Sequence, residues 1–362
     1  MADTPGLLAF KSRVDAALGA FVDQEIAHLV DIDAGLAPVG GQLRAATRDG
    51  KRLRAAFCYW GWRAAGQADG DAVVRAAAAM ELVHAAAVVH DDLIDRSRQR
   101  HGRPTAQWAL REELPRLARP AGAAEALAML VGNMLMAWAG QLFAASGLPA
   151  AYLSRARPLW ALLARELVAG ECLEILHTGA APDTEASLKI VRYKTAKYTV
   201  EQPLLIGASL GGASAGLRTC FTEYGVPLGE AFQLRDDVLG LFGDPTRTGK
   251  ANADDLVARR PTTLLAETWR RATPAERRDL RRLLGGGRGG GSSDGRAGGG
   301  NDSAALDRVR EIMRRTQAPD HIEQLIAERV CAALRALDRQ RLPATAAQAL
   351  ADLAHTATAR HH

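Results

Sequence analysis

Three aspartates, Asp91, Asp92 and Asp95, lie within five residues of one another at the end of a long apolar stretch. In a helix, at about 100° per residue, the first and last share one face and the middle one lies beside them. Carboxylates this close repel and raise one another's pKa unless a cation lies among them. Such hard oxygen ligands suit Mg²⁺, which completes its octahedron with water and phosphate oxygens.

A second acidic pair, Asp236 and Asp237, recurs in a similar apolar setting, and clusters of basic residues accompany both motifs. Lys51 and Arg54 stand at i and i+3, which in a helix would place them on one face, able to grip one phosphate group. The pattern predicts a site that holds a diphosphate through metal ions. The other basic or polar members of these clusters are Arg100, His101, Lys194, Thr195 and Lys250.

The composition of this 362-residue chain favours an all-α protein, because it is rich in Ala, Leu and Arg with few β-branched runs. The net charge is +5. The arginines are scattered along amphipathic stretches without aromatic residues between them, so a basic phosphate pocket explains the charge better than nucleic-acid binding.

Cysteine usage and the first residues predict a cytoplasmic protein. The four cysteines are far apart and form no CxxC pair, which is typical of small apolar residues in a reducing compartment. Residues 1–21 include charged side chains and lack the uninterrupted apolar segment of a signal peptide. Residues 126–154 carry no charge, but Asn133 and Gln141 interrupt them, so we interpret a buried helix rather than a transmembrane segment.

Hydrophobic spacing predicts one helical domain over residues 1–362, with a flexible Gly-rich surface loop at about 285–301. A break is expected at Gly40 and Gly41, and a basic loop at 96–104, where Gly102 and Pro104 disfavour helix. The expected helices are 1–37, 51–65, 71–95, 121–146, 150–177, 185–212, 214–241, 262–284, 303–316, 320–338 and 343–359.

Five segments together resemble the trans-isoprenyl diphosphate synthases of the polyprenyl synthetase family, geranylgeranyl diphosphate synthases among them. The resemblance implies an all-α bundle around a central cavity (the isoprenoid synthase type I fold), a homodimer, and three Mg²⁺ ions with diphosphate bound. The segments are GKRLRA (50–55), ELVHAAAVVHDDLIDRSRQRHGRPT (81–105), KTAKYTVEQPL (194–204), FQLRDDVLGLFGDPTRTGK (232–250) and RRTQAPDHIEQLI (314–326).

The resemblance also implies a reaction. An allylic diphosphate (dimethylallyl, geranyl or farnesyl) ionises, its cation alkylates isopentenyl diphosphate, and loss of a proton gives a chain one isoprene unit longer. Metal ions and lysines stabilise the charge that develops on the leaving diphosphate, and an apolar cavity keeps water from the cation.

Site roles follow from the matching positions. His84 lies seven residues before Asp91, two helical turns along the same face, and Gln233 lies one turn before Asp236. The resemblance assigns Asp91, Asp92, Asp95, Asp236 and Asp237 to metal, with Asp91, Asp92, Lys194, Asp236 and Lys250 as catalytic residues. It assigns Arg100, Lys194, Thr195 and Lys250 to the allylic diphosphate, and Lys51, Arg54 and His84 to isopentenyl diphosphate.

Four departures from the family pattern bear on the substrate pair. Gly240 replaces the usual third aspartate of the second motif, and His101 stands where a second arginine is usual, which predicts a weaker or pH-dependent grip on isopentenyl diphosphate. Arg98 stands where an acidic residue is common, and GECLE (170–174) replaces a version containing Gln and Asp.

Product length is predicted from residues before the first motif. Ala86 and Ala87 stand where farnesyl-forming enzymes tend to carry an aromatic residue, with Val83 and Met80 about one and two turns deeper. Small residues there predict geranylgeranyl diphosphate, with a longer polyprenyl product as the alternative.

Three other functions remain as alternatives. A class I terpene cyclase shares the fold, but it needs no second substrate site of the kind that Lys51, Arg54 and His84 predict. A non-catalytic partner subunit would be expected to lose metal ligands, and here five aspartates are in place. A metal phosphohydrolase, suggested by His90 next to Asp91, does not explain the second acidic pair.

Overall fold

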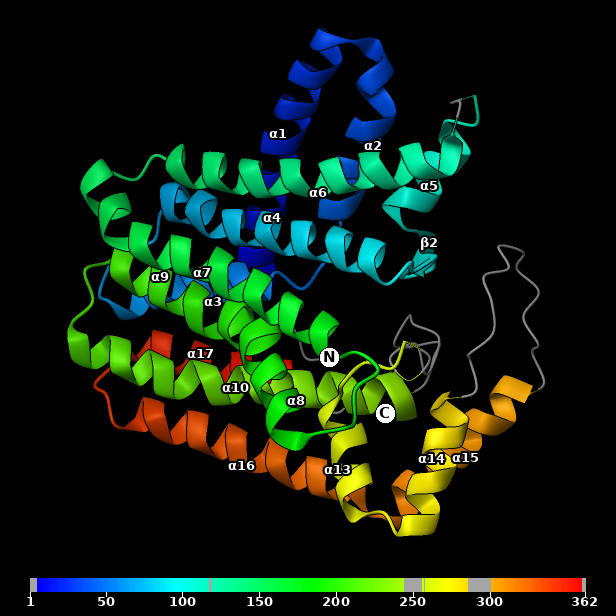
Figure 1. The fold of residues 1–362 in the computed structure, drawn as a ribbon. Helices are drawn as coiled ribbons and strands as arrows, with labels where there is room; N and C mark the ends of the chain where they lie inside the picture. The colour runs from blue at the N-terminus through cyan, green and yellow to red at the C-terminus, as the bar shows by residue number, and fades with distance from the viewer. Residues whose placement is uncertain (1–4, 117–118, 244–255, 257, 286–300, 360–362) are drawn as a thin grey trace. The chain divides into compact units, whose positions relative to one another are not determined.

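The computed structural model describes residues 5–116, 119–243, 256, 258–285 and 301–359, and over these residues the chain is almost entirely helical (Figure 1). The all-α prediction is confirmed. The two strands of the described part, β1 (Gln99–Arg100) and β2 (Arg103–Pro104), form one antiparallel hairpin in the predicted basic loop.

The helices follow one another along the chain with short connections. They are α1 (Pro5–Ile32), η1 (Ala34–Leu36), α2 (Ala37–Thr47), α3 (Leu53–Ala64), α4 (Asp71–Ile94), α5 (Ala106–Glu113), α6 (Pro120–Ala144), α7 (Ala150–His177), α8 (Thr184–Ile190), the π-helix η2 (Val191–Glu201), α9 (Gln202–Leu210), α10 (Ala215–Phe242), α13 (Thr263–Arg271), α14 (Pro274–Gly285), α15 (Asn301–Arg315), α16 (Ala318–Asp338) and α17 (Ala344–Thr358).

The chain divides into two compact units. Unit 1 comprises Met1–Leu162, Thr199–Thr222 and Ala336–Leu353, and unit 2 comprises Leu163–Tyr198, Glu223–Arg335 and Ala354–His362. The boundaries fall inside helices, whereas boundaries between independent domains usually fall in exposed linkers. One domain over the whole chain stays a prediction.

Unit 1 is built around α4, whose small and aliphatic side chains are buried over most of its length. Residues Ala76–Ala79 are fully buried, which lets α4 pack closely against α1, α2, α3 and α6. Burial on nearly every side explains why α4 is apolar all round. The helix therefore delivers the acidic motif at its C-terminal end from a rigid base.

Unit 2 has its own apolar core around the second half of α10. Leu234, Val238 and Leu241 of α10 pack with residues of α13, α14, α15 and α16, among them Leu280 and Ile312. The core side of α10 is thus fixed, and its polar side carries the second acidic motif.

Two helices are long and apolar enough to cross a membrane by length and composition alone, α4 and α6. In their apolar windows, 72% of α4 is buried but only 44% of α6. The expectation that α6 is buried on all sides is therefore wrong, since Met129 and Leu130 are nearly half exposed.

Gly40 and Gly41 do not break the chain as expected, because both lie inside α2, and the first helix ends earlier, at Ile32. A Cβ on Gly40 would lie 2.8 Å from Cγ2 of Ile26 on α1. Gly40 is therefore a point of close helix approach. The expected helix 262–284 is two helices, because the chain turns at Ala272 before Pro274. The predicted Gly-rich loop at 285–301 falls almost wholly outside the described residues.

The two adjacent glycines of α2 give a matched stability test. Gly41 has open space around its Cα, so Gly41→Ala should raise the free energy of unfolding by about 0.5–1 kcal/mol through helix propensity. Gly40→Ala should instead lower it by about 1–3 kcal/mol, because the stiff, β-branched Ile26 cannot easily move away. Urea unfolding of both variants measures the difference, and equal effects would contradict the close approach.

Candidate active site

The first acidic motif ends α4, where three aspartates differ in their surroundings. Asp92 is buried, and its carboxylate accepts bonds from Arg100 Nε (2.9 and 3.0 Å) and Arg100 Nη2 (2.8 Å). The Oδ2 atom of Asp91 lies 3.1 Å from the same Nη2, and the Asp91 side chain is 17% exposed. Asp95 is half-buried at the C-cap of α4. Arg100 thus compensates a charge cluster that the helix C-terminus itself disfavours.

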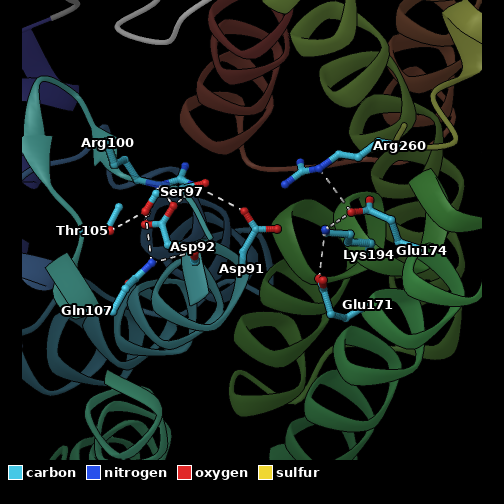
Figure 2. Close-up of polar contacts among 10 residues, drawn as sticks. All are labelled: Asp91, Asp92, Ser97, Arg100, Thr105, Gln107, Glu171, Glu174, Lys194 and Arg260. Atoms are coloured by element: carbon cyan, nitrogen blue, oxygen red, sulfur yellow. Dashed lines mark hydrogen bonds and ion pairs between the residues drawn. The ribbon is translucent and has the colours of Figure 1, made fainter. Parts of the chain in front are cut away.

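The loop that carries Arg100 is pinned to the end of α4 (Figure 2). Gln107 Nε2 donates to the carbonyl oxygen of Asp92 at 2.9 Å, and Thr105 Oγ1 donates to that of Ser97 at 2.6 Å. The hairpin turns at His101 and Gly102, both in the left-handed region, with φ of 50° and 74°. These bonds fix where Arg100 meets the aspartates.

Asp91, Asp92 and Asp95 were all predicted as metal ligands, and their chemistry fits Mg²⁺ as a set of hard oxygens. The structure separates their tasks, because the Asp92 carboxylate is already engaged by Arg100. Asp91 and Asp95 are the better candidates for direct coordination. The prediction for Asp92 stays a prediction.

A cavity of about 300 Å³ lies beside this motif in unit 1. Its basic lining includes Arg52, His84 and Arg100, and Val88 and Val89 of α4 give it an apolar wall. His101 and Arg103 of the hairpin complete the basic lining. The cavity combines positive charge with an apolar side, as binding of a small anionic molecule requires.

His84 lines this cavity with a perturbed imidazole. Burial lowers its pKa well below the usual 6.5, and the nearby guanidinium groups of Arg54 and Arg100 lower it further. The ring is therefore neutral near pH 7. It can orient a ligand by a hydrogen bond without adding charge.

The GKRLRA segment is not helical throughout, so the expectation that Lys51 and Arg54 share a helical face is wrong. Lys51 is exposed and precedes α3, because Gly50 and Arg52 have positive φ angles (146° and 54°). Arg54 is buried, and its Nη2 donates to Thr199 Oγ1 at 2.9 Å. Arg52, which sequence reasoning missed, donates to Asp15 Oδ1 at 2.7 Å and lines the cavity.

The second acidic motif, on α10 in unit 2, also separates its two aspartates. Asp236 is exposed and Asp237 is buried. A chain of hydrogen bonds orients Asp237, since Thr195 Oγ1 donates to Gln233 Oε1 and Gln233 Nε2 donates to Asp237 Oδ1, both at 2.8 Å. The predicted residues Thr195, Gln233 and Asp237 are therefore brought together. Lys250 lies outside the described residues.

Arg235, directly before the acidic pair, anchors this part of α10. Its Nη1 and Nη2 atoms donate to the Glu323 carboxylate of α16, and its Nε donates to the Thr358 carbonyl oxygen at the end of α17 (3.3 Å). Arg235 is buried, so this anchor holds the backbone of the motif firmly.

Lys194 lies on the π-helix η2, and π-helical segments are frequent at functional sites. Its Nζ atom lies 2.9 Å from Glu171 and 2.7 Å from Glu174, both on α7, and Arg260 Nε lies 3.7 Å from Glu174 (Figure 2). Sequence reasoning noted GECLE (170–174) only as a departure and missed these contacts. The partners stand 20 residues or more apart, so no local signal links them.

The residues predicted to set product length lie on α4 and differ in exposure. Ala86 and Val83 are buried to 1% or less, and Met80 likewise. Ala87, by contrast, is only partly buried. Ala87 is therefore the position at which a larger side chain has room to project.

Comparison with known proteins gives concordant results. The sequence model described as polyprenyl synthetase matches residues 42–293. The (2E,6E)-farnesyl diphosphate synthase of Mycobacterium tuberculosis is 34% identical over 223 residues, 61% of this chain but only 56% of that protein. The geranylfarnesyl diphosphate synthase of Aeropyrum pernix is 29% identical over 297 residues, 78% of this chain and 88% of that protein.

Among solved structures, a geranylgeranyl pyrophosphate synthase from Corynebacterium glutamicum, complexed with isoprenyl diphosphate and magnesium, superposes with a TM-score of 0.88. It is 32% identical, and the match covers 97% of this chain and 99% of that one. Its fold is therefore shared over nearly the full length.

The perturbed His84 gives a pH prediction. Below pH 6.5 the unfolded chain protonates this residue and the folded chain does not, so unfolding takes up a proton and stability falls as pH falls. His84→Gln should therefore lose less stability than the wild type between pH 7.5 and 5.5, by about 1 kcal/mol. Urea unfolding at both pH values measures this, and parallel losses in the two proteins would show that His84 titrates normally.

Proposed function

We propose, since this chain belongs to the polyprenyl synthetase family, that it is a magnesium-dependent trans-prenyltransferase that condenses isopentenyl diphosphate with an allylic diphosphate. The observation that carries the proposal is the pair of acidic motifs. In each, one aspartate (Asp92 or Asp237) is buried and fixed by hydrogen bonds, and its neighbour (Asp91 or Asp236) is more exposed.

The proposed metal ligands are Asp91, Asp95 and Asp236, with Asp92 and Asp237 as the other carboxylates of the two motifs. Bound Mg²⁺, three ions by the resemblance to the family, would neutralise diphosphate charge and stabilise it as a leaving group. Arg100, held against Asp92, presents its charge at a fixed place beside the motif. That both acidic motifs grip one diphosphate stays a prediction.

The cavity beside the first motif is the proposed site of isopentenyl diphosphate. Arg52, Arg100 and Arg103 supply charge for the diphosphate, and Val88 and Val89 face the cavity with apolar surface. Its volume of about 300 Å³ suits a molecule with a five-carbon body. His101, in place of a second arginine, makes this grip depend on pH near neutrality.

A geranylgeranyl product is proposed because the residues before the first motif are small. Farnesyl and geranylfarnesyl diphosphate synthases are among the relatives, so a longer product is the alternative. Ala87 offers space rather than an aromatic barrier.

A homodimer is proposed because each unit exposes apolar residues on a long helix. Met129 and Leu130 are exposed on α6 of unit 1. Val168, Ile175 and Leu176 are exposed on α7 in unit 2. A second copy of the chain would remove such surface from water. The four free cysteines agree with a proposed reducing, cytoplasmic location.

The test incubates isopentenyl diphosphate with dimethylallyl, geranyl or farnesyl diphosphate, in Mg²⁺ or in EDTA, and resolves the products by length. We expect condensation with Mg²⁺ and none in EDTA, because the acidic motifs alone repel a diphosphate. Hydrocarbon formed from farnesyl diphosphate alone would favour the terpene cyclase instead. No condensation with any primer would overturn the proposal.

Product length is tested at Ala87. Ala87→Phe should shorten the main product by at least one isoprene unit, because the ring would project where the growing chain passes. Ala87→Ser, which adds one atom, should leave the product unchanged and serves as the control. An unchanged product in Ala87→Phe would place the floor of the cavity on other residues.

A further inference from the structure

The ammonium group of Lys194 is shared by two carboxylates. Glu171 Oε2 and Glu174 Oε1 lie 2.9 and 2.7 Å from Nζ, and all three side chains are at most one-fifth exposed. Two carboxylates one helical turn apart would repel each other strongly without a cation between them. The lysine and the two glutamates therefore act as one electrostatic unit.

The backbone brings these groups together at Gly170. A Cβ on this residue would lie 2.3 Å from the backbone nitrogen and 2.6 Å from the Cα of Lys194. Only glycine therefore allows α7 to touch η2 at this point. The contact sets Glu171 and Glu174, which follow at once on α7, around the lysine side chain.

A diphosphate that binds Lys194 must compete with these carboxylates. Phosphate oxygens and carboxylate oxygens seek the same three ammonium hydrogens. Two carboxylates already compensate the single positive charge, and Glu174 also has Arg260 nearby at 3.7 Å. Each carboxylate also repels an incoming anion.

We propose, resting on the proposed role of Lys194 in diphosphate binding, that Glu171 and Glu174 are positioning residues that compete with the diphosphate for Lys194 and so weaken its binding. Glu171 is the member to test, because Glu174 has Arg260 as a second cationic neighbour. Charge at position 171, where the family usually carries a neutral glutamine, then sets how readily the chain releases a diphosphate.

The neighbouring pair on the same two helices provides a matched control. Lys197 Nζ lies 3.2 Å from Glu166 Oε2, with similar exposure of both side chains (16% and 15%). Glu166→Gln removes one negative charge from α7 as Glu171→Gln does. It leaves the contacts of Lys194 intact.

The experiment measures binding of inorganic pyrophosphate to the full chain by calorimetry in excess Mg²⁺. Glu171→Gln should lower the dissociation constant by about fivefold, which corresponds to the upper end of a partly exposed ion pair. Glu166→Gln should leave it unchanged. In a Lys194→Gln background, Glu171→Gln should give no gain, because the shared lysine is gone. The KM for the allylic substrate should fall by a similar factor without a rise in kcat.

Several outcomes would overturn the proposal. Weaker binding in Glu171→Gln would mean that Glu171 assists the metal–diphosphate complex. An equal gain in Glu166→Gln, or a gain that survives Lys194→Gln, would trace the effect to overall charge. Pyrophosphate binding by none of the proteins, wild type included, would overturn the proposed function as well, whereas the other outcomes leave that function standing.

Discussion

Carboxylates gathered at one place must be compensated, and this constraint organises the chemistry of the chain. At the end of α4 the cation is Arg100, which a two-strand hairpin holds against Asp92. On α7 the cation is Lys194, which a π-helical segment brings between Glu171 and Glu174. In both places a straight α-helix supplies the anions and an irregular element supplies the cation. Irregular backbone can aim a side chain where regular spacing cannot.

The apolar packing exists to make such clusters tolerable. Residues Ala76–Ala79 give α4 a surface that neighbouring helices approach closely, so its acidic end is held without freedom to spread its charges. In unit 2, Leu234 and Val238 fix the core side of α10, and Arg235 anchors its backbone to Glu323 and the end of α17. Rigid supports keep like charges at the distances a metal ion needs, which loops would not do.

The fold class, most helix positions and the acidic motifs could be predicted, because hydrophobic spacing and carboxylate clusters are local signals. What could not be predicted depends on distant contacts. The sequence around Lys51 looks helical, yet Arg52 adopts a left-handed conformation, stabilised by its bond to Asp15 on another helix. Gly40 looked like a helix breaker because its neighbour Ile26 lies far away in sequence. The contacts between Lys194 and the glutamates of α7 had no local signal for the same reason.

The second motif meets the same constraint with neutral partners. Asp237 is oriented by the amide of Gln233, which Thr195 holds in turn, so a network of dipoles takes the place that a guanidinium has beside Asp92. Dipoles compensate less charge than a full cation does. Gly240 agrees with this, because it replaces a third carboxylate and limits the motif to two negative charges. The missing aspartate therefore lowers the charge that this weaker network has to balance.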